Sequence, residues 1–417
     1  MEAARRATCR LCNGKALQLV VNMKPVPLAE KYTTSLEEAR HAPRYPIDLY
    51  RCDLCSHIQL LDVINSQDLW SDYTYHSGQT QGIIDHFQAV SNNIISKYRP
   101  KAGSLVIDIG SNDGTLLRFF KNAAYKVHGV DPAIQIAEKA TASGIETTPA
   151  LFTDQVANSI RNKYGKASVI TAFNVYAHAD DLSAMTKAIC SILAPDGIFV
   201  IEVQYLLDII DKVLIGTIFH EHMSHHSLRP LAQFFDAHDL EIIDVERVSI
   251  QKGSLIVVSQ FKGGARLVST AVHELVRLEK ERNLDQIVSM QEFNERIDRN
   301  RKVANELMQH WEKQSLTVAG YGAARSGPTL MAQFGFDRII QYIFDDHPQK
   351  INRYSPGTGS PVVPTAVLLE KKPDIVIILA WIHARAIIEK SQSYLDAGGK
   401  FVICTPDIRI IDKDNPL

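Results

Sequence analysis

The most constraining feature of this chain of 417 residues is an alternation of short apolar segments with helix-length amphipathic segments, which occurs twice. Between residues 80 and 260 the apolar segments are short and β-branched, as in the strands of a parallel sheet covered on both faces. We expect strands at 105–109, 126–130, 169–173 and 198–203, helices at 135–142 and 181–193, and an antiparallel pair near 241–246 and 254–260. This alternation predicts a doubly wound α/β fold.

The same alternation begins again after residue 313, where apolar segments predict a second parallel sheet with strands at 316–321, 339–344, 375–380 and 400–404. The charged stretch between the two patterns has apolar positions at helical spacing and predicts one or two long helices. A chain of this length is expected to form more than one domain. We therefore expect a small N-terminal unit at 1–80, a first α/β domain at 81–266, a helical connector at 267–313 and a Rossmann-like domain at 314–417.

The N-terminal unit is expected to bind zinc because four of the six cysteines form two C-x-x-C pairs, Cys9 with Cys12 and Cys52 with Cys55. Four thiolates are the tetrahedral, soft ligand set that suits a zinc ion, and with all four positions filled the metal should be structural. The stretch between the pairs is longer than in most zinc ribbons, but ribbons tolerate insertions. Two disulfides or a redox pair are the alternative, which a cytoplasmic setting disfavours.

Charge and hydropathy argue against several classes of protein. The 45 basic and 47 acidic residues leave a net charge of −2, and no basic stripe carries interleaved aromatic residues, so no nucleic-acid partner is expected. The longest apolar run, near 375–381, is far too short to span a membrane, and the N-terminus lacks the apolar region of a secretory signal. We therefore expect a cytoplasmic protein, monomeric or weakly homo-oligomeric, that acts on a small molecule.

The turn after the first strand of the central domain has the character of a cofactor site. In Val106-Ile-Asp-Ile-Gly-Ser-Asn-Asp-Gly114 the glycines allow a ligand to approach closely, and the following helix offers free N–H groups. Asp108 and Asp113 flank Gly110, and such a carboxylate-rich turn repels a pyrophosphate and favours a cationic ligand. S-adenosylmethionine (SAM), with its sulfonium and ammonium groups, is a ligand of this kind.

The second strand ends in Asp131, which is placed to accept hydrogen bonds from ribose hydroxyls. The turn, its strand context and this acid together predict a class I SAM site, in which Phe152 is either a neighbour of the adenine or a core residue. The residues expected to contact SAM are Asp108, Gly110, Ser111, Asn112, Asp113, Asp131, Phe152 and Asn174.

Four histidines and one glutamate fall within Thr217-Ile-Phe-His-Glu-His-Met-Ser-His-His226, a run that we expect to lie outside the core because it is so polar. A metal site, a solvated loop and an acid–base cluster are the three interpretations. The zincin pattern H-E-x-x-H is absent because Ser224 stands at its last position, although His220 and His222 could share one face of a strand. We favour acid–base chemistry, because histidine titrates near neutral pH and Glu221 can orient it.

Further candidate site residues follow the ends of expected strands or lie between two domains. His178 comes after the strand expected at 169–173, at the edge where open α/β sheets place their sites. Tyr73 and Tyr75 lie where the N-terminal unit joins the central domain, and they could cover the site or simply pack. The turn Gly320-Tyr-Gly-Ala-Ala-Arg-Ser-Gly327, with Asp345 after the next strand, is a loose dinucleotide pattern. We interpret it as the holder of a substrate's nucleotide diphosphate, the alternatives being a weak NAD site or a unit that only packs.

In their order along the chain, the patterns C-x-x-C, C-x-x-C, D-Y-x-Y-x-S, D-I-G-S-N-D-G, N-V-x-A-H, H-E-H and P-G-T resemble those of the zinc-containing, SAM-dependent sugar C-methyltransferases. The resemblance spans essentially the whole chain. It implies a zinc domain, a SAM domain and a C-terminal Rossmann-like domain around a nucleotide-linked keto-deoxysugar. It also implies methyl transfer to the carbon next to the ketone, typically C3 of a 4-keto sugar, in the biosynthesis of branched deoxysugars.

Residue by residue, the resemblance makes His222 the general base, Glu221 its neighbouring acid, His178 the histidine of the strand end and Tyr73 the tyrosine of the joint. The chain departs from the family at Phe219, where a tyrosine often precedes H-E-H, and at Arg325 and Ser326, where a lysine is usual. Both departures leave room for a different substrate within the same chemistry. The residues expected to contact the substrate are Tyr75, His220, Arg325, Ser326 and Asp345.

Methyl transfer to carbon requires a carbanion equivalent, which a neighbouring ketone supplies as an enolate. His222 is expected to remove the proton, and His178 or Tyr73 to donate a hydrogen bond to the enolate oxygen. The alternatives are methyl transfer to a non-sugar keto metabolite, or an NAD-binding or sugar-nucleotide-binding protein that depends on the C-terminal domain.

Overall fold

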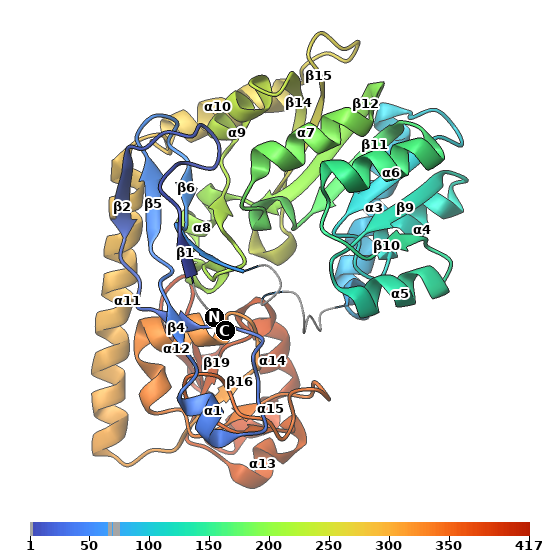
Figure 1. The fold of residues 1–417 in the computed structure, drawn as a ribbon. Helices are drawn as coiled ribbons and strands as arrows, with labels where there is room; N and C mark the ends of the chain where they lie inside the picture. Colours follow the sequence, from blue (N-terminus) through green and yellow to red (C-terminus); the bar gives the residue numbers. More distant parts are fainter. Residues whose placement is uncertain (1–2, 66–68, 70–75) are drawn as a thin grey trace.

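The structure is a computed structural model that describes residues 3–65, 69 and 76–417. It consists of three units, and two helices connect the central unit to the C-terminal one (Figure 1). The N-terminal unit lies beside the central sheet, and the C-terminal unit lies against both (Figure 1). Tyr73 and Tyr75 lie outside the described residues. Within the described ranges, no helix combines the length and the apolar character that crossing a membrane requires.

The N-terminal unit is built around a four-stranded antiparallel sheet with the strand order β13-β6-β5-β2. Three of its strands come from the N-terminal part of the chain, namely β2 (Leu17–Val21), β5 (Leu49–Cys52) and β6 (Ile58–Gln59). The fourth, β13 (Ser224–His225), belongs to the histidine-rich segment, which is thereby hydrogen-bonded to the N-terminal unit. The unit also contains β1 (Ala3–Arg5), β3 (Val26–Pro27), α1 (Leu36–Arg40), β4 (Arg44–Tyr45) and β7 (Asp62–Ile64).

The central unit contains a seven-stranded sheet in the order β10-β9-β8-β11-β12-β15-β14. The first five strands are parallel, and β15 is antiparallel to both of its neighbours, β12 and β14. The strand order runs outward from β8 in both directions, so the carboxyl ends of β8 and β11 form the switch point at which open sheets bind ligands. The strands are β8 (Leu105–Ile109), β9 (Lys126–Val130), β10 (Thr147–Thr148), β11 (Ala167–Phe173), β12 (Leu193–Gln204), β14 (Leu240–Val248) and β15 (Ser254–Phe261). The six strands expected from the sequence are present.

Helices cover both faces of this sheet because its side chains alternate. Val106 of β8 packs in one core with apolar residues of α3 and α4, whereas Ile107 packs in another with residues of α6 and α7. The helices of the unit are α3 (Gln81–Tyr98), α4 (Thr115–Asn122), α5 (Ile134–Ala142), α6 (Asp154–Tyr164), α7 (Leu182–Ile192), α8 (Leu206–Asp211) and α9 (Leu228–Asp236).

The C-terminal unit contains a six-stranded sheet in the order β18-β17-β16-β19-β20-β21. The expected strand at 339–344 is wrong except for its last two residues, because Phe336–Arg338 form a 3-10 turn and Ile339 keeps a helical conformation. The strands are β16 (Val318–Tyr321), β17 (Ile343–Phe344), β18 (Val362–Val363), β19 (Ile375–Ile378), β20 (Lys400–Ile403) and β21 (Arg409–Ile411). The helices are α12 (Gly327–Phe334), α13 (Leu368–Lys371), α14 (Ala384–Lys390) and α15 (Gln392–Asp396).

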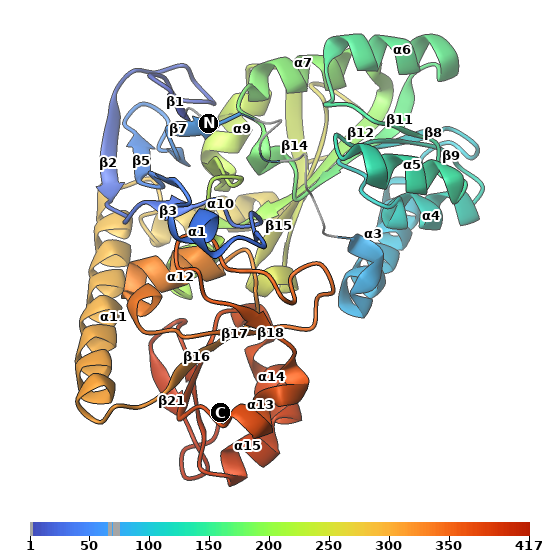
Figure 2. The same ribbon diagram turned by 60° about the horizontal axis from the view of Figure 1, so that its bottom comes forward.

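Two helices, α10 (Thr270–Glu281) and α11 (Ile287–Lys313), connect the central and C-terminal units. α11 packs against β2, α8 and α12, and so contacts all three units (Figure 2). Its apolar positions recur at helical spacing and are buried, including Met290, Phe293, Ile297, Ala304, Met308 and Trp311.

Candidate functional site

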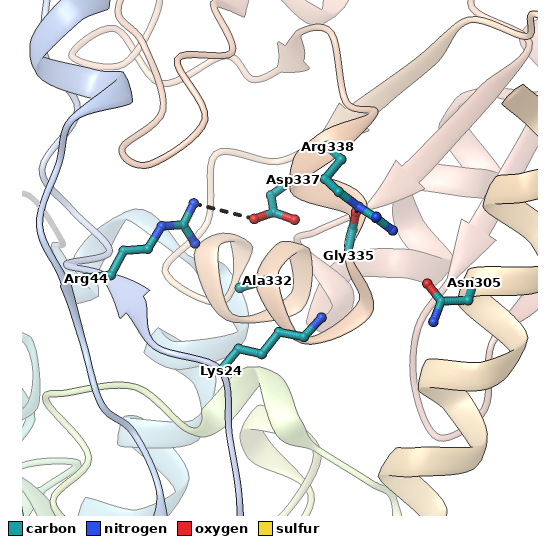
Figure 3. A pocket seen from close by; sticks show the side chains of 7 residues that line it. All are labelled: Lys24, Arg44, Asn305, Ala332, Gly335, Asp337 and Arg338. Atoms are coloured by element: carbon teal, nitrogen blue, oxygen red, sulfur yellow. Dashed lines mark hydrogen bonds and ion pairs between the residues drawn. The ribbon is translucent and has the colours of Figure 1, made fainter.

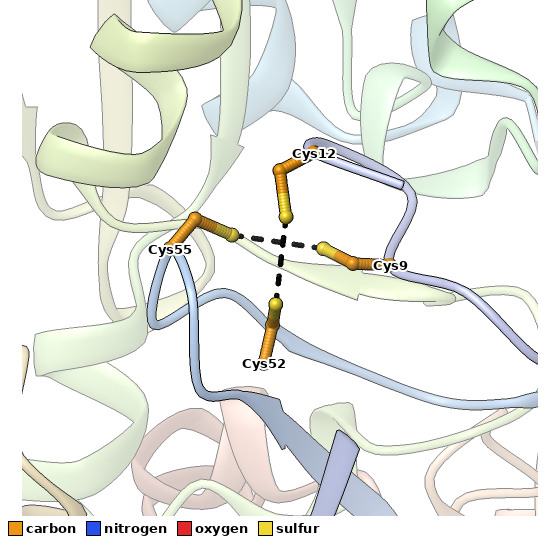
Figure 4. Close-up of side chains that lie close together, drawn as sticks. All are labelled: Cys9, Cys12, Cys52 and Cys55. Atoms are coloured by element: carbon orange, nitrogen blue, oxygen red, sulfur yellow. Dashed lines mark hydrogen bonds between the residues drawn. The ribbon is translucent and has the colours of Figure 1, made fainter. Parts of the chain in front are cut away.

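The two C-x-x-C pairs converge into one cluster of sulfur atoms (Figure 4). The Sγ atoms of Cys9 and Cys55 are 3.6 Å apart, those of Cys12 and Cys52 are 3.5 Å apart, and all four lie within 4.8 Å of one another. A zinc ion about 2.3 Å from each of four thiolates places the sulfur atoms about 3.8 Å apart. The cluster therefore fits a tetrahedral zinc ion with no ligand position left for a substrate.

The loop between β8 and α4 turns sharply at Gly110. This residue has φ = +71°, and its N–H donates to the carbonyl oxygen of Val130 at 2.7 Å. A Cβ atom here would lie 2.1 Å from Cγ2 of Val175, which no side chain tolerates. Glycine is therefore required, and the loop lies directly against the residues that follow β11.

Asp131, at the end of β9, is held by the same loop. Its Oδ2 accepts the N–H of Asn112 at 2.8 Å and its Oδ1 accepts that of Ala133 at 2.9 Å. Burial raises the pKa of this carboxyl, and the two hydrogen bonds oppose the rise. Each oxygen keeps a further acceptor position, so the expected bonds from ribose hydroxyls remain possible.

Two other predicted SAM contacts are engaged with the protein. Asp108 is almost fully buried and accepts a hydrogen bond from Oγ1 of Thr171 at 2.6 Å, and burial raises its pKa to about 7. Oδ2 of Asp113 accepts the N–H of Gly78 at 2.9 Å. Asp108 therefore supports the loop from within the sheet, and Asp113 ties the loop to the segment that precedes α3.

The remaining predicted SAM contacts lie on or around the same loop. The Oγ of Ser111 is buried, has no hydrogen-bond partner among the described residues, and lies beside Gly129 of β9. Asn174 follows β11 in the left-handed conformation, with φ = +56°. Phe152 is half-buried and packs against the core, which leaves both interpretations of this residue open.

The expectation that the histidine-rich segment lies outside the core is wrong. His220, Glu221, His225 and His226 are at most 5% exposed, because the segment lies where the three units meet. His220 and His222 do not share a strand face, since residues 217–223 form turns, and Nε2 of His220 donates to the carbonyl oxygen of Tyr45 at 3.2 Å. Among the described residues, the four cysteines are the one grouping of side chains that could hold a metal ion.

His222 and His178 face each other within this junction, with ring centroids 5.1 Å apart and planes at 17°. Nδ1–H of His222 donates to the carbonyl oxygen of Thr217 at 2.6 Å, so Nε2 carries the lone pair. Burial lowers the pKa of His222 to about 4, and it lowers that of His178 well below the ordinary value. The imidazole of His222 is thus neutral at physiological pH and able to accept a proton.

Glu221 belongs to an ion-pair network that joins the three units. Arg325 places Nη1 2.6 Å from Oε2 of Glu221 and Nε 3.3 Å from Oε1 of Glu30. Lys350 reaches Oε2 of Glu30 at 3.1 Å. Burial raises the pKa of Glu221, and the charge of Arg325 opposes this. Glu30 and Lys350 were not predicted, because no sequence pattern links positions so far apart.

The C-terminal turn repeats the backbone pattern of the loop between β8 and α4. Oδ2 of Asp345 accepts the N–H of Ala323 at 2.6 Å, and Oδ1 accepts that of His347 at 2.7 Å. The hydroxyl of Ser326 donates to the carbonyl oxygen of Leu379 at 2.8 Å and is buried. The structure therefore places Ser326 in a contact within its own unit, and Asp345 beside the turn as expected.

Two cavities adjoin these units. A small cleft of about 10 Å³ opens beside Phe219 and Glu221 and is also lined by Glu30. A larger hollow of about 410 Å³ lies at the other end of α12, away from the histidines, and contains the 3.4 Å ion pair of Arg44 with Asp337 (Figure 3). Its lining residues are Lys24, Arg44, Asn305, Ala332, Gly335, Asp337 and Arg338.

Sequence models of three families match successive parts of the chain. They are a zinc binding domain at residues 9–70, a methyltransferase domain at 86–245 and the C-methyltransferase C-terminal domain at 249–406. The C-methyltransferase NovU of Streptomyces niveus is 31% identical to this chain over 410 residues, which cover 98% of each protein.

Two of the solved structures that match part of this chain are methyltransferases. Magnesium protoporphyrin IX methyltransferase from Synechocystis PCC 6803, with bound SAH, matches 46% of this chain and 91% of its own at 18% identity and a TM-score of 0.33. A SAM-dependent methyltransferase from Clostridium acetobutylicum ATCC 824 matches 43% of this chain and 92% of its own at 12% identity and a TM-score of 0.35.

Proposed function

Because the chain belongs to the family of zinc-containing, SAM-dependent C-methyltransferases, we propose that it methylates the carbon next to the ketone of a nucleotide-linked keto-deoxysugar. The near full-length match to NovU supports C-methyl transfer. The sugar is inferred from the family motifs in the sequence. The four cysteines hold zinc, which stabilises the N-terminal unit and takes no part in the reaction.

In this proposal the loop after β8 binds the cofactor. SAM supplies an electrophilic methyl group. Gly110, Ser111 and Asn112 of the loop line the amino-acid part, and Asp131 accepts hydrogen bonds from the ribose hydroxyls. Asn174, at the end of the neighbouring strand, borders the same site. Aligning two reactants in one cleft supplies several kcal/mol of the reduction in barrier, about 7 kcal/mol or more in favourable cases.

His222 acts as the general base in this proposal, and the state of its ring is the observation that carries it. Nδ1–H is held by the carbonyl oxygen of Thr217, so Nε2 is left as the acceptor for the proton removed from the substrate. His178, stacked on His222, is placed to donate to the enolate oxygen. Glu221, the next residue in the chain, is the neighbouring acid of this proposal, and Arg325 pairs with it.

The substrate is tested by mass spectrometry with SAM that carries a deuterated methyl group, offered with a panel of 4-keto nucleotide sugars. We expect one or more sugars to gain the labelled methyl group on the carbon next to the ketone. Labelling of a non-sugar keto metabolite alone would replace the sugar by another substrate class. Labelling of oxygen or nitrogen in the product would contradict the enolate mechanism.

The base is tested with His222→Gln, with His383→Gln, an exposed histidine of the C-terminal unit, as the matched control. We expect His222→Gln to lower kcat about a thousandfold and to abolish exchange of the acidic C–H with D2O in the presence of SAH. SAM affinity should stay within about twofold, because the residue acts on the substrate. Equal loss of SAM binding would show that His222 is structural.

A further inference from the structure

A buried carboxylate at the end of β12 has no part in the mechanism above. Glu202 is fully buried in a strand that is otherwise apolar at this point. Its Oε2 lies 2.5 Å from Nε2 of His86 on α3, and its Oε1 accepts a hydrogen bond from Nδ2 of Asn174 at 3.2 Å. A carboxylate removed from water in this way depends strongly on its partners. Both partners are linked to residues 110–114, the loop that we propose binds SAM and call the SAM loop.

The first connection runs through Asn174. The N–H of this residue also donates to the carbonyl oxygen of Glu202 at 2.8 Å, so Glu202 fixes both the backbone and the side chain of the left-handed turn after β11. The next residue, Val175, is the one that lies against Gly110. A shift of Asn174 would therefore press on the loop at its tightest point.

The second connection runs through His86 and the segment that precedes α3. The N–H of Ser77 donates to Oδ1 of Asn112, and the N–H of Gly78 donates to Oδ2 of Asp113, both at 2.9 Å. α3 begins three residues later, at Gln81, and carries His86. The ion pair with Glu202 therefore anchors the helix whose leading segment is hydrogen-bonded to the loop.

His86 and Glu202 are held in contact by a short hydrogen bond. Burial on its own lowers the pKa of His86, but the hydrogen bond to Glu202 and its negative charge outweigh burial, so the pKa is raised. When His86 is protonated, the two residues form an ion pair without net charge. In that state the pair acts on the loop through geometry, and contributes little field at the position of a sulfonium.

We propose that Glu202 is a positioning residue for the cofactor, which joins the two segments that hold residues 110–114 and so fixes the shape of the SAM loop. This inference rests on the proposed location of SAM at that loop. It predicts that a change at Glu202 weakens the binding of SAM, whose sulfur is positively charged, and of the product SAH, whose sulfur is uncharged, by the same factor.

The test measures the affinities of Glu202→Gln and His86→Gln for SAM and SAH by calorimetry. We expect both variants to bind both ligands about tenfold more weakly, while kcat at saturating SAM and the KM of the second substrate change less than about twofold. The double variant should bind no more weakly than the worse single variant, because one pair is being removed. Glu246→Gln, at an exposed glutamate that accepts a hydrogen bond from Asn93 of the same helix, is the matched control and should bind normally.

Unchanged affinity in a folded Glu202→Gln variant would overturn the proposal. Loss of SAM affinity alone would overturn it as well, since the carboxylate would then act on the sulfonium charge. If Glu202→Gln does not fold, the same measurements on His86→Gln decide. Gly110→Ala separates this inference from the proposed SAM site. Normal SAM binding in that variant would contradict the location of the site. Weak SAM binding in Gly110→Ala together with normal binding in the Glu202 and His86 variants would contradict only the positioning role of Glu202.

Discussion

Compared with the loop after β8, the loop after β16 repeats the same backbone hydrogen bonds in different surroundings. Gly110 and Gly322 both have positive φ, and each donates its N–H at 2.7 Å to the last residue of the neighbouring strand. Asp131 and Asp345 follow those strands, and each accepts two backbone N–H groups. The turn itself is therefore common to both units.

The surroundings of the two loops differ in what is left for a ligand. The first loop keeps a buried hydroxyl, at Ser111, without a partner in the described part of the chain. The second loop ends in Arg325, which is paired with Glu221 of the central unit and Glu30 of the N-terminal unit. Backbone geometry shows where a ligand can lie, but the neighbouring charges show that the second loop also serves to hold the units together.

The largest expected difference is in stability at acid pH, which should fall more in the histidine-rich segment of the central unit than in the C-terminal unit. Burial lowers the pKa of each histidine in the 220–226 segment to about 4 or about 3. The unfolded chain takes up these protons near pH 6.5 and the folded segment does not, so the contribution to stability is full above that pH and is lost as the pH falls. From pH 7 to pH 6, each histidine should remove about 0.7 kcal/mol of unfolding free energy, about 3 kcal/mol together. Urea titrations at the two pH values measure this change.

Hydrogen exchange at pH 6 locates the loss. Protection should fall first in residues 220–226 and in β6, which pairs with β13, while the sheet of the C-terminal unit keeps its protection. Equal loss in both regions would contradict the assignment to the buried histidines.

The two glycines give the next largest effect. A Cβ at Gly110 would lie 2.1 Å from Val175, and one at Gly322 would lie 2.3 Å from Cβ of Ala380. We expect Gly110→Ala to weaken SAM binding by about a hundredfold, because steric overlap and positive φ both oppose the loop. Gly322→Ala should lower the melting temperature and leave SAM affinity nearly unchanged. Gly103→Ala, at a glycine with positive φ and open space around it, controls for backbone strain alone. Weak SAM binding in Gly322→Ala would mean that the two loops are not separate in function.

Removing the Arg325 side chain should have a smaller effect on stability and kcat, and it should leave the affinity for SAM unchanged. Arg325→Gln leaves Glu221 buried without its cation, so unfolding free energy should fall by about 2 kcal/mol and kcat about tenfold. Adding Glu221→Gln should restore part of the stability, because the buried carboxylate that has lost its cation is then removed. Arg385→Gln, which breaks an exposed pair with Glu389, is the control and should change little. Chemical denaturation and steady-state kinetics measure both effects, and an unaltered kcat would exclude a role for Glu221 beside the base.

Asp108→Asn should have the smallest effect. The side chain is nearly fully buried and has a pKa of about 7, and an amide oxygen can accept the same hydrogen bond from Thr171. SAM affinity should therefore change by less than about threefold. A much larger loss would show that the charge of Asp108 contacts SAM directly, and would restore the role that the sequence suggested.

The elements that the sequence predicts well are those set by local pattern. The strands at 105–109 and 126–130 have the expected bounds, because short β-branched runs between turns can form little else. The cysteine cluster was predicted for a similar reason, since two C-x-x-C pairs can satisfy one tetrahedral ion. The strand expected at 339–344 was too long. The first residues of this run are apolar but follow a turn instead of forming a strand, and tertiary packing decides between the two conformations.

The features that the sequence did not predict depend on contacts between distant residues. The polarity of the 217–226 segment suggested exposure, yet the junction of three units buries it, and no local pattern reports that junction. Glu30 lies far along the chain from its partners Arg325 and Lys350, and this network was missed for the same reason. A signal did exist for Glu202, because a glutamate inside the apolar run 198–203 is unusual for a strand buried on both faces.

The helix α11, of 27 residues, has a consequence for how such proteins can diversify. At about 1.5 Å per residue it extends about 40 Å, and along that length it is seated on β2, α8 and α12. If the C-terminal unit were exchanged for that of a relative, either its α12 would have to pack against the original α11, or a new α11 would have to pack against β2 and α8. Single substitutions where the three units meet are therefore a simpler route to a new methyl acceptor than exchange of a whole domain.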